Sequence, residues 1–294
     1  MRKKVSPKSK IIKHPKLNVL SLFDGISCGQ HVLRYYLGVK HMTYYASEIE
    51  KDPIANTQHN FPDTIQLGDV TKINPTKLPV MDLLLGGSPC QGFSLSGNGG
   101  AFNDPRSKLF FEYVRIYRAL RKRNPKLYFL LENVVMPPQH KNVISKYMEV
   151  EPIYIDSALF SAQSRKRLYW TNIPMAPLPA KECMFCLQDI LDPPYYGGAF
   201  VQNINPHKGG WAQNRLVTNI YGKSHTLVKS QNSVNVPLSY HTSRKATSHE
   251  LERLAGLPDD YTITCGSPRN RLAAIGNGWE CNTIAFILNH FNQK

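Results

Sequence analysis

Up to about Pro174, hydrophobic and polar residues follow the order typical of strands that alternate with helices. Short apolar runs predict five strands: Asn18–Phe23, Met42–Ser47, Thr64–Leu67, Leu83–Leu85 and Leu127–Leu131. Apolar residues at helical spacing predict three helices: Gln30–Leu37, Lys51–Asn60 and Lys108–Arg123. This alternation predicts an α/β fold with a doubly wound, mostly parallel sheet, followed by a small loop-rich region.

Each predicted strand is followed by a residue that can take part in chemistry. These residues are, in order, Asp24, Glu48, Asp69, Cys90 and Glu132. In a parallel sheet the carboxyl ends of the strands lie along one edge, where ligands bind. We therefore expect these five side chains, which are far apart in sequence, to meet in one crevice.

The segment Gly86-Gly87-Ser88-Pro89-Cys90-Gln91 follows the fourth predicted strand. Proline fixes its own backbone angle, and paired glycines remove the side chains that would block a close approach. This turn therefore predicts that Cys90 is presented to the crevice. A packed cysteine in a glycine-rich turn is the alternative interpretation.

The turn Asp24-Gly25-Ile26-Ser27-Cys28-Gly29 suggests a nucleoside site. Glu48 stands 23 residues after Gly25, about where an acidic residue receives ribose hydroxyls in nucleoside-binding sheets. The turn does not match the G-x-G-x-x-G fingerprint, and the chain has no phosphate loop, so an adenosyl ligand fits better than a pyrophosphate. Asp69 either accepts a hydrogen bond from an adenine amino group or stabilises its own turn.

Cys90 and Glu132 together suggest a type of reaction. A thiol becomes a nucleophile as thiolate, which nearby cations favour, and Gln163-Ser164-Arg165-Lys166-Arg167 can supply them. A carboxylic acid hydrogen-bonded to a ring nitrogen makes a heteroaromatic ring accept a nucleophile, provided burial raises its affinity for a proton. A turn pair at Glu132-Asn133 and a solvated basic face at the arginines are the alternatives.

The net charge of +15 is distributed unevenly. Met1–Lys16 carries seven Lys or Arg residues and no acid, lacks the apolar core of a secretory signal, and is interpreted as a disordered basic arm. Pro193–His249 has no Asp or Glu in 57 residues, and its basic and aromatic residues interleave. This composition is typical of a surface that contacts nucleic acid, although a solvated loop region of biased composition is the alternative.

Six cysteines in 294 residues do not form a disulfide framework, so we expect free thiols in a reducing compartment. Cys183 and Cys186 make half of a zinc site at most, because no second close pair follows, and we expect no metal. The longest apolar runs are far shorter than a membrane span, so no membrane contact is expected.

Taken together, the motifs resemble those of the DNA (cytosine-5) methyltransferases, and they occur in the usual order of that family from about Asn18 to Phe291. The matching motifs are Phe23-Asp24-Gly25-Ile26-Ser27-Cys28-Gly29, Ser47-Glu48, Gly68-Asp69-Val70, Ser88-Pro89-Cys90-Gln91, Glu132-Asn133-Val134, Gln163-x-Arg165-x-Arg167, Glu250–Pro258 and Gly276-Asn277. Gly276-Asn277-Gly278-Trp279 is similar to the animal de novo branch, and Cys90-Gln91-Gly92-Phe93-Ser94 to bacterial and phage enzymes.

The resemblance implies transfer of a methyl group from S-adenosylmethionine to carbon 5 of a cytosine that is flipped out of double-stranded DNA, through a covalent cysteine adduct. The implied catalytic residues are Cys90, Glu132, Arg165 and Arg167. The implied cofactor-binding residues are Phe23, Asp24, Gly25, Ile26, Ser27, Cys28, Gly29, Glu48, Ile49, Asp69, Val70, Gly87, Pro89, Asn277, Gly278 and Trp279. The implied DNA-binding residues are Gln91, Ser94, Arg106, Gln163, Arg215, Lys223, Lys229 and Arg244.

The resemblance also implies an organisation of the chain. We expect a basic arm at 1–16, a cofactor-binding and catalytic domain at 17–180, a small target-recognition region at 181–246, and a segment at 247–294 that returns to the catalytic domain. The expected location is the cytoplasm of a bacterial or phage-infected cell, or the nucleus for a eukaryotic or viral source. Both a monomer and a homodimer fit the sequence.

Two departures from the family pattern are His249, where Arg is usual, and Leu257, where Phe is usual. They affect the support of the DNA-reading segment and leave the catalytic motifs intact. An RNA cytosine methyltransferase is the main alternative, but the Cys-Phe-Thr segment of the tRNA-modifying branch does not occur. An inactive DNA-binding regulator would have lost the cysteine or the cofactor turn, and a dinucleotide-dependent oxidoreductase would need the missing glycine fingerprint.

Overall fold

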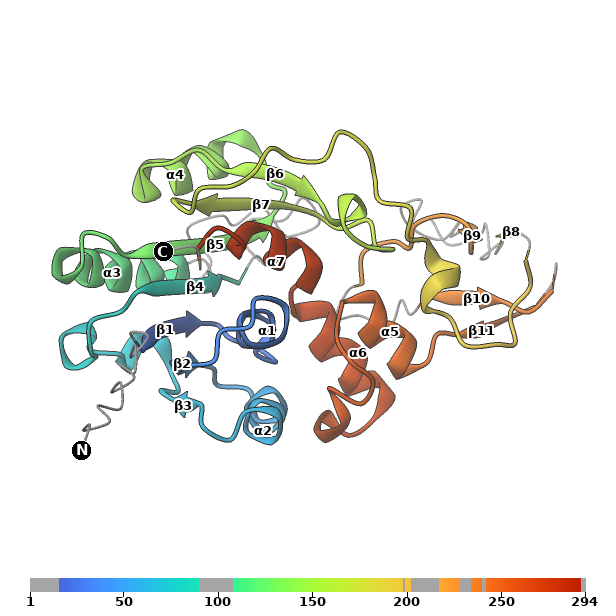
Figure 1. The fold of residues 1–294 in the computed structure, drawn as a ribbon, viewed down its shortest axis with the longest axis horizontal. Helices are drawn as coiled ribbons and strands as arrows, with labels where there is room; N and C mark the ends of the chain where they lie inside the picture. The colour runs from blue at the N-terminus through green and yellow to red at the C-terminus, as the bar shows by residue number, and fades with distance from the viewer. Residues whose placement is uncertain are drawn as a thin grey trace, which may run out of the picture.

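A seven-stranded sheet forms the centre of the protein (Figure 1). The computed structural model describes residues 16–89, 108–197, 199–201, 217–227, 234–239 and 242–291. The strands are β1 (Leu17–Leu22), β2 (Met42–Ser47), β3 (Ile65–Gln66), β4 (Leu83–Gly87), β5 (Tyr128–Val134), β6 (Ile153–Asp156) and β7 (Lys166–Thr171). Their order is β3-β2-β1-β4-β5-β7-β6, and β7 runs antiparallel to both of its neighbours while the other pairs are parallel. The predicted doubly wound, mostly parallel sheet is therefore confirmed.

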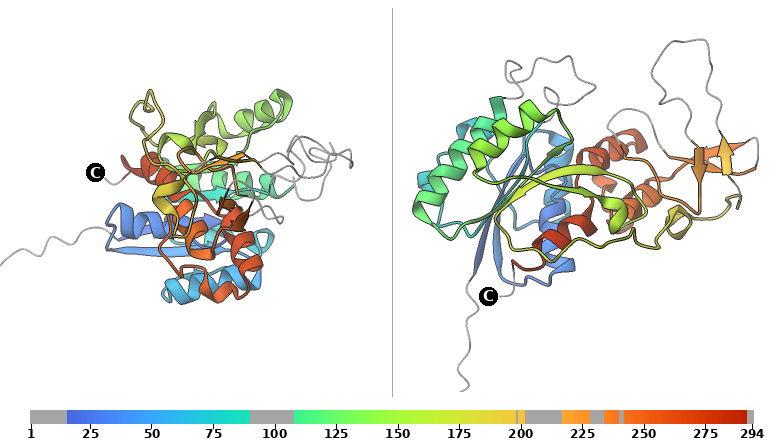
Figure 2. Two further views of the ribbon diagram at one scale, coloured as in Figure 1. Left: turned by 90° about the vertical axis from the view of Figure 1, so that its right-hand side faces the viewer. Right: turned by 90° about the horizontal axis from the view of Figure 1, so that it is seen from above.

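Helices cover both faces of this sheet, as the right-hand view of Figure 2 shows. They are α1 (Cys28–His31), α2 (Lys51–Asn60), α3 (Lys108–Arg123), α4 (Pro138–Met148), α5 (Ser248–Leu254), α6 (Pro268–Asn277) and α7 (Cys281–Leu288). Short helical turns lie at η1 (Val32–Tyr36), η2 (Val70–Lys72), η3 (Pro75–Lys77), η5 (Ser157–Leu159), η6 (Leu187–Ile190) and η8 (Ile263–Cys265).

The alternation of side chains along the strands divides the core into two clusters. In β1, Val19 packs in one cluster while Leu20 and Leu22 pack in the other, because successive side chains of a strand point to opposite faces. The first cluster includes residues of α1, α5, α6 and α7, and the second includes residues of α3 and α4. Burial on both faces explains why these strands are continuous apolar runs.

Three predicted elements, Met42–Ser47, Lys51–Asn60 and Lys108–Arg123, occur with the predicted bounds. The predicted helix Gln30–Leu37 was wrong in detail, because α1 begins at Cys28 and passes at Val32 into a wider π-helical turn. The expectation that Glu132-Asn133 follows its strand was also wrong. β7 pairs with β5 as far as Val134, so both residues lie inside β5.

The small region beyond α5 and α6 contains two two-stranded sheets (Figure 1). They consist of β8 (Ala199–Val201) with β9 (Val217–Asn219), and β10 (Asn235–Pro237) with β11 (Ser243–Lys245). The division of the chain at 180 and 246 stays a prediction. None of the helices in the described ranges has the length and apolar character needed to cross a membrane.

Candidate cofactor and catalytic site

A cavity of about 490 Å³ lies at the carboxyl ends of the parallel strands. Three of the five residues expected to meet there, Glu48, Asp69 and Glu132, line it together. Gly87, Ser88 and Pro89, which lead to Cys90, line it as well. Cys90 itself lies outside the described residues, as do Gln91, Ser94, Arg106, Arg215 and Lys229.

The first turn bends sharply to form one wall of this cavity. Phe23, Gly25 and Ser27 all have positive φ, at 57°, 58° and 58°, a conformation that is costly for the two residues with side chains. Phe23, Gly25 and Ile26 line the cavity. The other residues predicted from this motif, Asp24, Ser27, Cys28 and Gly29, are not among its lining residues and support the turn from behind.

Gly29 and Asp24 show how that support works. A Cβ at Gly29 would lie 2.7 Å from Leu85 Cδ1, so the glycine allows α1 to pack closely on the sheet. The Asp24 carboxylate accepts hydrogen bonds from Ser27 and, at 2.9 Å, from Tyr44. Burial raises the pKa of Asp24 to about 6, despite hydrogen bonds that act in the opposite direction.

Glu48, immediately after β2, is fixed by backbone amides. Its Oε1 accepts from the N–H groups of Ile49 and Glu50 at 2.7 and 2.9 Å, and its Oε2 accepts from Gly25 N–H at 2.9 Å. A carboxylate offers about four acceptor positions, so one is left for a ligand hydroxyl. The bond to Gly25 also ties the ends of β1 and β2 together at the cavity wall.

Asp69 stabilises its own turn, which was one of the two interpretations of this residue. Its Oδ1 accepts from Thr71 N–H at 2.9 Å and from Thr71 Oγ1 at 2.8 Å, and these hydrogen bonds lower the pKa of Asp69. Asp69 and its neighbour Val70 also line the cavity. The adenine contact, the other interpretation, stays a prediction.

Glu132 has two partners at the opposite wall. Arg167 Nε lies 2.9 Å from Glu132 Oε1, because antiparallel pairing of β5 and β7 places the two residues on neighbouring strands. Trp279 Nε1 donates to Glu132 Oε2 at 3.3 Å. A Cβ at Gly87 would lie 3.0 Å from Glu132 Oε2 and 3.1 Å from Trp279 Nε1, so a glycine is needed for this approach.

Asn133 has a structural role that the sequence reasoning did not assign. Its Nδ2 donates to Ser88 O at 3.3 Å and to Ser88 Oγ at 3.1 Å, and its side chain is buried. These bonds hold the end of β4 just before Pro89 and Cys90. The position of Asn133 directly after Glu132 in the Glu-Asn-Val motif was the available signal.

Arg165 is buried at 5% exposure and binds backbone carbonyls. Its guanidinium donates to the oxygens of Leu227, Gly276 and Gly278, the last at 2.9 Å. Burial and the neighbouring Arg167 lower the pKa of Arg165 to about 10. Arg165 thus joins β7 to the carboxyl end of α6, and it also lines the cavity beside Asn277.

Three residues predicted to bind DNA are either buried or bound to other groups of the protein. Gln163 is only 2% exposed, and Lys223 Nζ donates to the carbonyls of Ser161, Cys183 and Phe185 at 2.6 to 2.9 Å. Arg244 donates to both carboxylate oxygens of Glu250 at 2.6 and 2.8 Å, and this pairing raises its pKa. Contact of these groups with DNA stays a prediction, and it would require Gln163 to become exposed and Lys223 and Arg244 to leave these partners.

A larger cavity, of about 690 Å³, lies elsewhere and is lined mainly by aromatic and apolar side chains. None of the predicted catalytic or cofactor-binding residues lines it, so the smaller cavity is the candidate site. Within the described part of the chain, no group of three His, Cys, Asp or Glu side chains is arranged to hold a metal ion.

The sheet and its carboxyl-edge cavity define a protein of the methyltransferase fold. Two solved structures share this fold: an Entamoeba histolytica methyltransferase, EhMeth, with a TM-score of 0.68 at 17% identity, and the S. pombe Dnmt2 methyltransferase, with 0.70 at 16%. The alignments cover 95% and 94% of this chain and all of the two solved chains.

Residues 17–174, more than half of the chain, match the sequence model of the family described as C-5 cytosine-specific DNA methylase, and the chain belongs to this family. The orphan methyltransferase M.SPRI of Bacillus phage SPR is 38% identical over 171 residues, which are 54% of this chain and 38% of the phage protein. The type II methyltransferase M1.ScrFI of Lactococcus lactis subsp. cremoris is 29% identical over 290 residues, covering 85% of this chain and 72% of that protein. The chain thus spans less than half the length of the phage relative.

Proposed function

We propose that this protein transfers a methyl group from S-adenosylmethionine to carbon 5 of cytosine in double-stranded DNA, through a covalent adduct with Cys90. Membership of the C-5 cytosine family supports the reaction type. The observation that carries the proposal is the pairing of Glu132 with Arg167 at 2.9 Å, on the cavity wall next to the Ser88-Pro89 turn that leads to Cys90.

The residues of the cavity fit an adenosyl cofactor. Glu48 keeps an acceptor position for a ribose hydroxyl, and the lining has no glycine-rich phosphate loop. Ten of the residues predicted to bind the cofactor line the cavity: Phe23, Gly25, Ile26, Glu48, Ile49, Asp69, Val70, Gly87, Pro89 and Asn277. When bound there, S-adenosylmethionine supplies an electrophilic methyl group.

The chain's own residues then act on the base. The thiolate of Cys90 adds to carbon 6 of a flipped-out cytosine, and the electron pair of the 5,6 double bond becomes available at carbon 5. In its protonated form Glu132 donates a hydrogen bond to the ring nitrogen, its other oxygen accepts one from the exocyclic amine, and the two bonds stabilise the activated ring. After the methyl group has been accepted, carbon 5 loses its proton, the double bond re-forms and Cys90 leaves.

The buried arginines position these groups. Arg167 balances the charge of Glu132 and fixes its orientation across the β5–β7 pair. Arg165 holds the backbone of Gly276 and Gly278, which places Trp279 against Glu132. The acid-free stretch Pro193–His249 supplies a surface for DNA contact, and the proposed location is the cytoplasm of a bacterial or phage-infected cell.

Incubation with unmethylated DNA and S-adenosylmethionine, followed by bisulfite sequencing, tests the proposal. We expect cytosines resistant to conversion within a fixed sequence motif. Cys90→Ser should give none while it still binds the cofactor, and the matched control Cys183→Ser should behave as the parent. A folded parent protein that protects no cytosine, or methylation that persists in Cys90→Ser, would contradict the proposal.

A further inference from the structure

The larger cavity, of about 690 Å³, has no part in the proposed reaction. Its volume is within the range of small-molecule sites, which is about 300 to 1,000 Å³. The residues that line it come from η1, the end of α2, the segment after α5 and the first turn of α7, together with loop residues such as Phe160 and Phe185. It is therefore a separate concavity with the dimensions of a ligand site.

Aromatic rings form much of the wall of this cavity. Phe61 and Tyr261 are buried at 2% and 3% exposure, whereas Tyr35 and Phe185 are 67% and 61% exposed. The ring centroids of Tyr35 and Phe61 lie 6.3 Å apart, and those of Phe61 and Tyr261 lie 6.4 Å apart. Rings that only stabilise the core are covered by other side chains, but large rings that stay exposed around a cavity can stack on a flat ligand.

Two neighbouring residues keep this space open. Leu257 lines the cavity and stands where the family pattern has the larger Phe. Gly256 has φ of 73°, and a Cβ there would lie 2.9 Å both from Tyr36 Oη and from Asn282 Nδ2. The glycine lets these two side chains approach, and Tyr36 Oη donates to the Gly256 oxygen at 2.6 Å. The wall at this point is therefore fixed without filling the cavity.

Two amide side chains that line the cavity have free hydrogen-bond acceptors. Asn60 Nδ2 donates to the oxygens of Asn56 and Tyr261 at 3.0 and 2.9 Å, and Asn282 Nδ2 donates to Glu280 Oε1 at 2.7 Å. These bonds fix the orientation of both amides, because only the nitrogen can donate. Among the described residues, neither Oδ1 has a hydrogen-bond partner. A ligand with N–H donors matches these oxygens.

Arg253 is the charged side chain among the described residues that line the cavity, and acids already pair with it. Its Nε and Nη2 donate to the two carboxylate oxygens of Asp259 at 2.7 and 2.6 Å. Its Nη1 donates to Asp192 Oδ1 at 2.7 Å and to the Ile190 oxygen at 3.3 Å. Four of the five N–H groups of the guanidinium are thus used within the protein.

The other basic groups around the cavity are neutral or bound as well. His31 lines the cavity, and burial lowers its pKa to about 4, so its ring is uncharged at pH 7. Lys223 uses its three donors on three backbone carbonyls, and Arg34, which lies over the Phe61 ring, pairs with Asp63. A phosphate or carboxylate would find no free cation here, so the cavity suits an uncharged ligand.

We propose that this cavity binds a neutral, planar heteroaromatic molecule with an amino group, the class that includes nucleobases and nucleosides. The rings supply stacking surfaces for its faces, and the free oxygens of Asn60 and Asn282 supply acceptors for its amino group. The inference goes beyond the proposed function, because it requires neither DNA nor methyl transfer.

Three probes test the proposed class in calorimetric titrations without DNA. They are the nucleoside of 2-aminopurine, the nucleoside of unsubstituted purine, and the 5′-monophosphate of the first probe. S-adenosylhomocysteine is present in excess to occupy the smaller cavity. We expect the aminopurine nucleoside to bind, the purine nucleoside to bind about tenfold more weakly, and the phosphate to give no gain in affinity.

Alanine substitutions of exposed rings test the place of binding without disturbing the core. Tyr35→Ala and Phe185→Ala should each raise the Kd of the aminopurine nucleoside about tenfold through lost stacking. The matched controls are Tyr154→Ala and Met184→Ala, at residues that are 48% and 98% exposed and do not line the cavity. Their Kd should stay within about twofold of that of the parent.

Leu257→Phe restores the family pattern and should also weaken binding, because the larger side chain fills part of the cavity. Circular dichroism should show the same fold in all variants. No binding by the parent, parent-like affinity in both Tyr35→Ala and Phe185→Ala, equal affinity for the purine nucleoside, or tighter binding of the phosphate would each overturn the proposal. An absence of methyl transfer would contradict the proposed function alone, because these titrations need no DNA.

Discussion

The two edges of the central sheet carry charged side chains in different physical settings. At the carboxyl edge, Glu48 and Glu132 are held by backbone amides, by Arg167 and by Trp279, and they line a cavity. At the amino edge the charged side chains are exposed, and they include the bases Arg123 and Lys126 and the acids Asp63 and Glu151. Charged groups that are fixed and partly buried can stabilise charge that develops in a reaction. Exposed charges contribute mainly long-range electrostatic interactions, which salt weakens. Substitutions at the two edges should therefore have different consequences.

The largest effect is expected for Glu132→Gln, which keeps the size of the side chain and removes its charge. The substitution leaves Arg167 without its carboxylate and weakens the hold on the base, so kcat should fall about 10²- to 10³-fold. The dissociation constant of the cofactor should stay within about threefold, since other residues bind the adenosyl group. Single-turnover methyl transfer measures the first quantity, and calorimetric titration the second.

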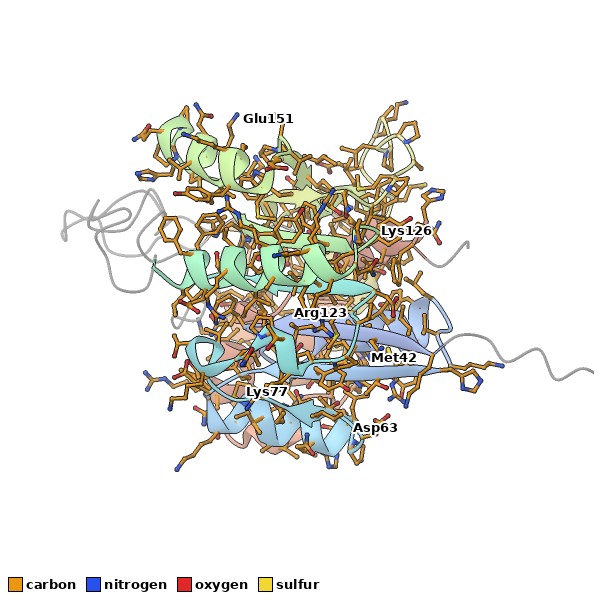
Figure 3. The ribbon with its side chains drawn as sticks, turned by 90° about the vertical axis from the view of Figure 1, so that its left-hand side faces the viewer. Met42, Asp63, Lys77, Arg123, Lys126 and Glu151 are labelled. Atoms are coloured by element: carbon orange, nitrogen blue, oxygen red, sulfur yellow. The ribbon has the colours of Figure 1, made fainter. Side chains whose placement is uncertain are left out.

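The matched control is Glu151→Gln at the amino edge, where the side chain is 73% exposed and labelled in Figure 3. It should behave as the parent. A kcat for Glu132→Gln close to that of Glu151→Gln would show that the Glu132 carboxylate takes no part in the reaction.

Asp24→Asn should remove the part of the pH dependence of the free energy of unfolding that is caused by the buried Asp24 carboxyl group at the carboxyl edge. The folded protein binds the proton of Asp24 more tightly than the unfolded chain, because burial raises the pKa from 3.8 to about 6. The stabilising contribution of this proton is full below about pH 4 and is lost as the pH rises through 6. The free energy of unfolding of the parent, relative to Asp24→Asn, should therefore fall by about 3 kcal/mol between these limits.

Urea unfolding of both proteins across this pH range gives the difference directly. Asp63→Asn, at an exposed residue of the amino edge, is the control and should give a difference from the parent without this fall. A flat difference curve for Asp24→Asn would mean that folding leaves the pKa of Asp24 unchanged.

Glu48→Gln should affect the cofactor and leave the chemistry nearly unchanged. Loss of the charged acceptor should raise the dissociation constant of S-adenosylmethionine about 10- to 100-fold. At saturating cofactor, kcat should stay within about threefold, because Glu48 does not touch the reacting base. Parent-like cofactor affinity in calorimetric titration would remove Glu48 from the ribose site.

Asn133→Ala should have the smallest effect of the four substitutions. The loss of two hydrogen bonds to Ser88 should lower the free energy of unfolding by about 1 kcal/mol. It should also lower kcat about tenfold through misplacement of the turn before Cys90, with unchanged cofactor affinity. Asn142→Ala, on the exposed side of α4, is the control. Equal loss of kcat and of cofactor affinity would indicate general loosening rather than positioning of the turn.

The sequence predicts much of the sheet because its strands are buried on both faces and therefore read as continuous apolar runs. It also predicts which strand ends meet, since a parallel sheet aligns them, and Glu48, Asp69 and Glu132 line one cavity as expected. The pattern of apolar and polar residues does not reveal hydrogen-bond partners that come from distant segments of the chain. Arg165 looks like a free cation in sequence, but the carbonyls that bind it belong to residues more than 60 positions away.

The incorrect prediction of where the strand before Glu132 ends has the same cause, because it too depends on contacts with a distant segment. Glu132 lies inside β5 because β7 pairs alongside it, and that register depends on tertiary contacts. Arg244 and Lys223 look available for DNA in an acid-free stretch, yet Glu250 and three backbone carbonyls bind them in the folded protein. Composition therefore identifies a basic region, and only the fold separates its structural cations from its exposed ones.

Attack by Cys90 on cytosine is tested most directly with duplex DNA in which 5-fluorocytosine replaces the target base. Fluorine at carbon 5 cannot leave as a proton does, so the adduct cannot resolve once the methyl group has been accepted. With S-adenosylmethionine present, mass spectrometry should find the base attached to the peptide that contains Cys90, and no such species should form in Cys90→Ser. Methyl transfer to ordinary cytosine without any trapped Cys90 adduct, or an adduct on another cysteine, would contradict the proposed mechanism.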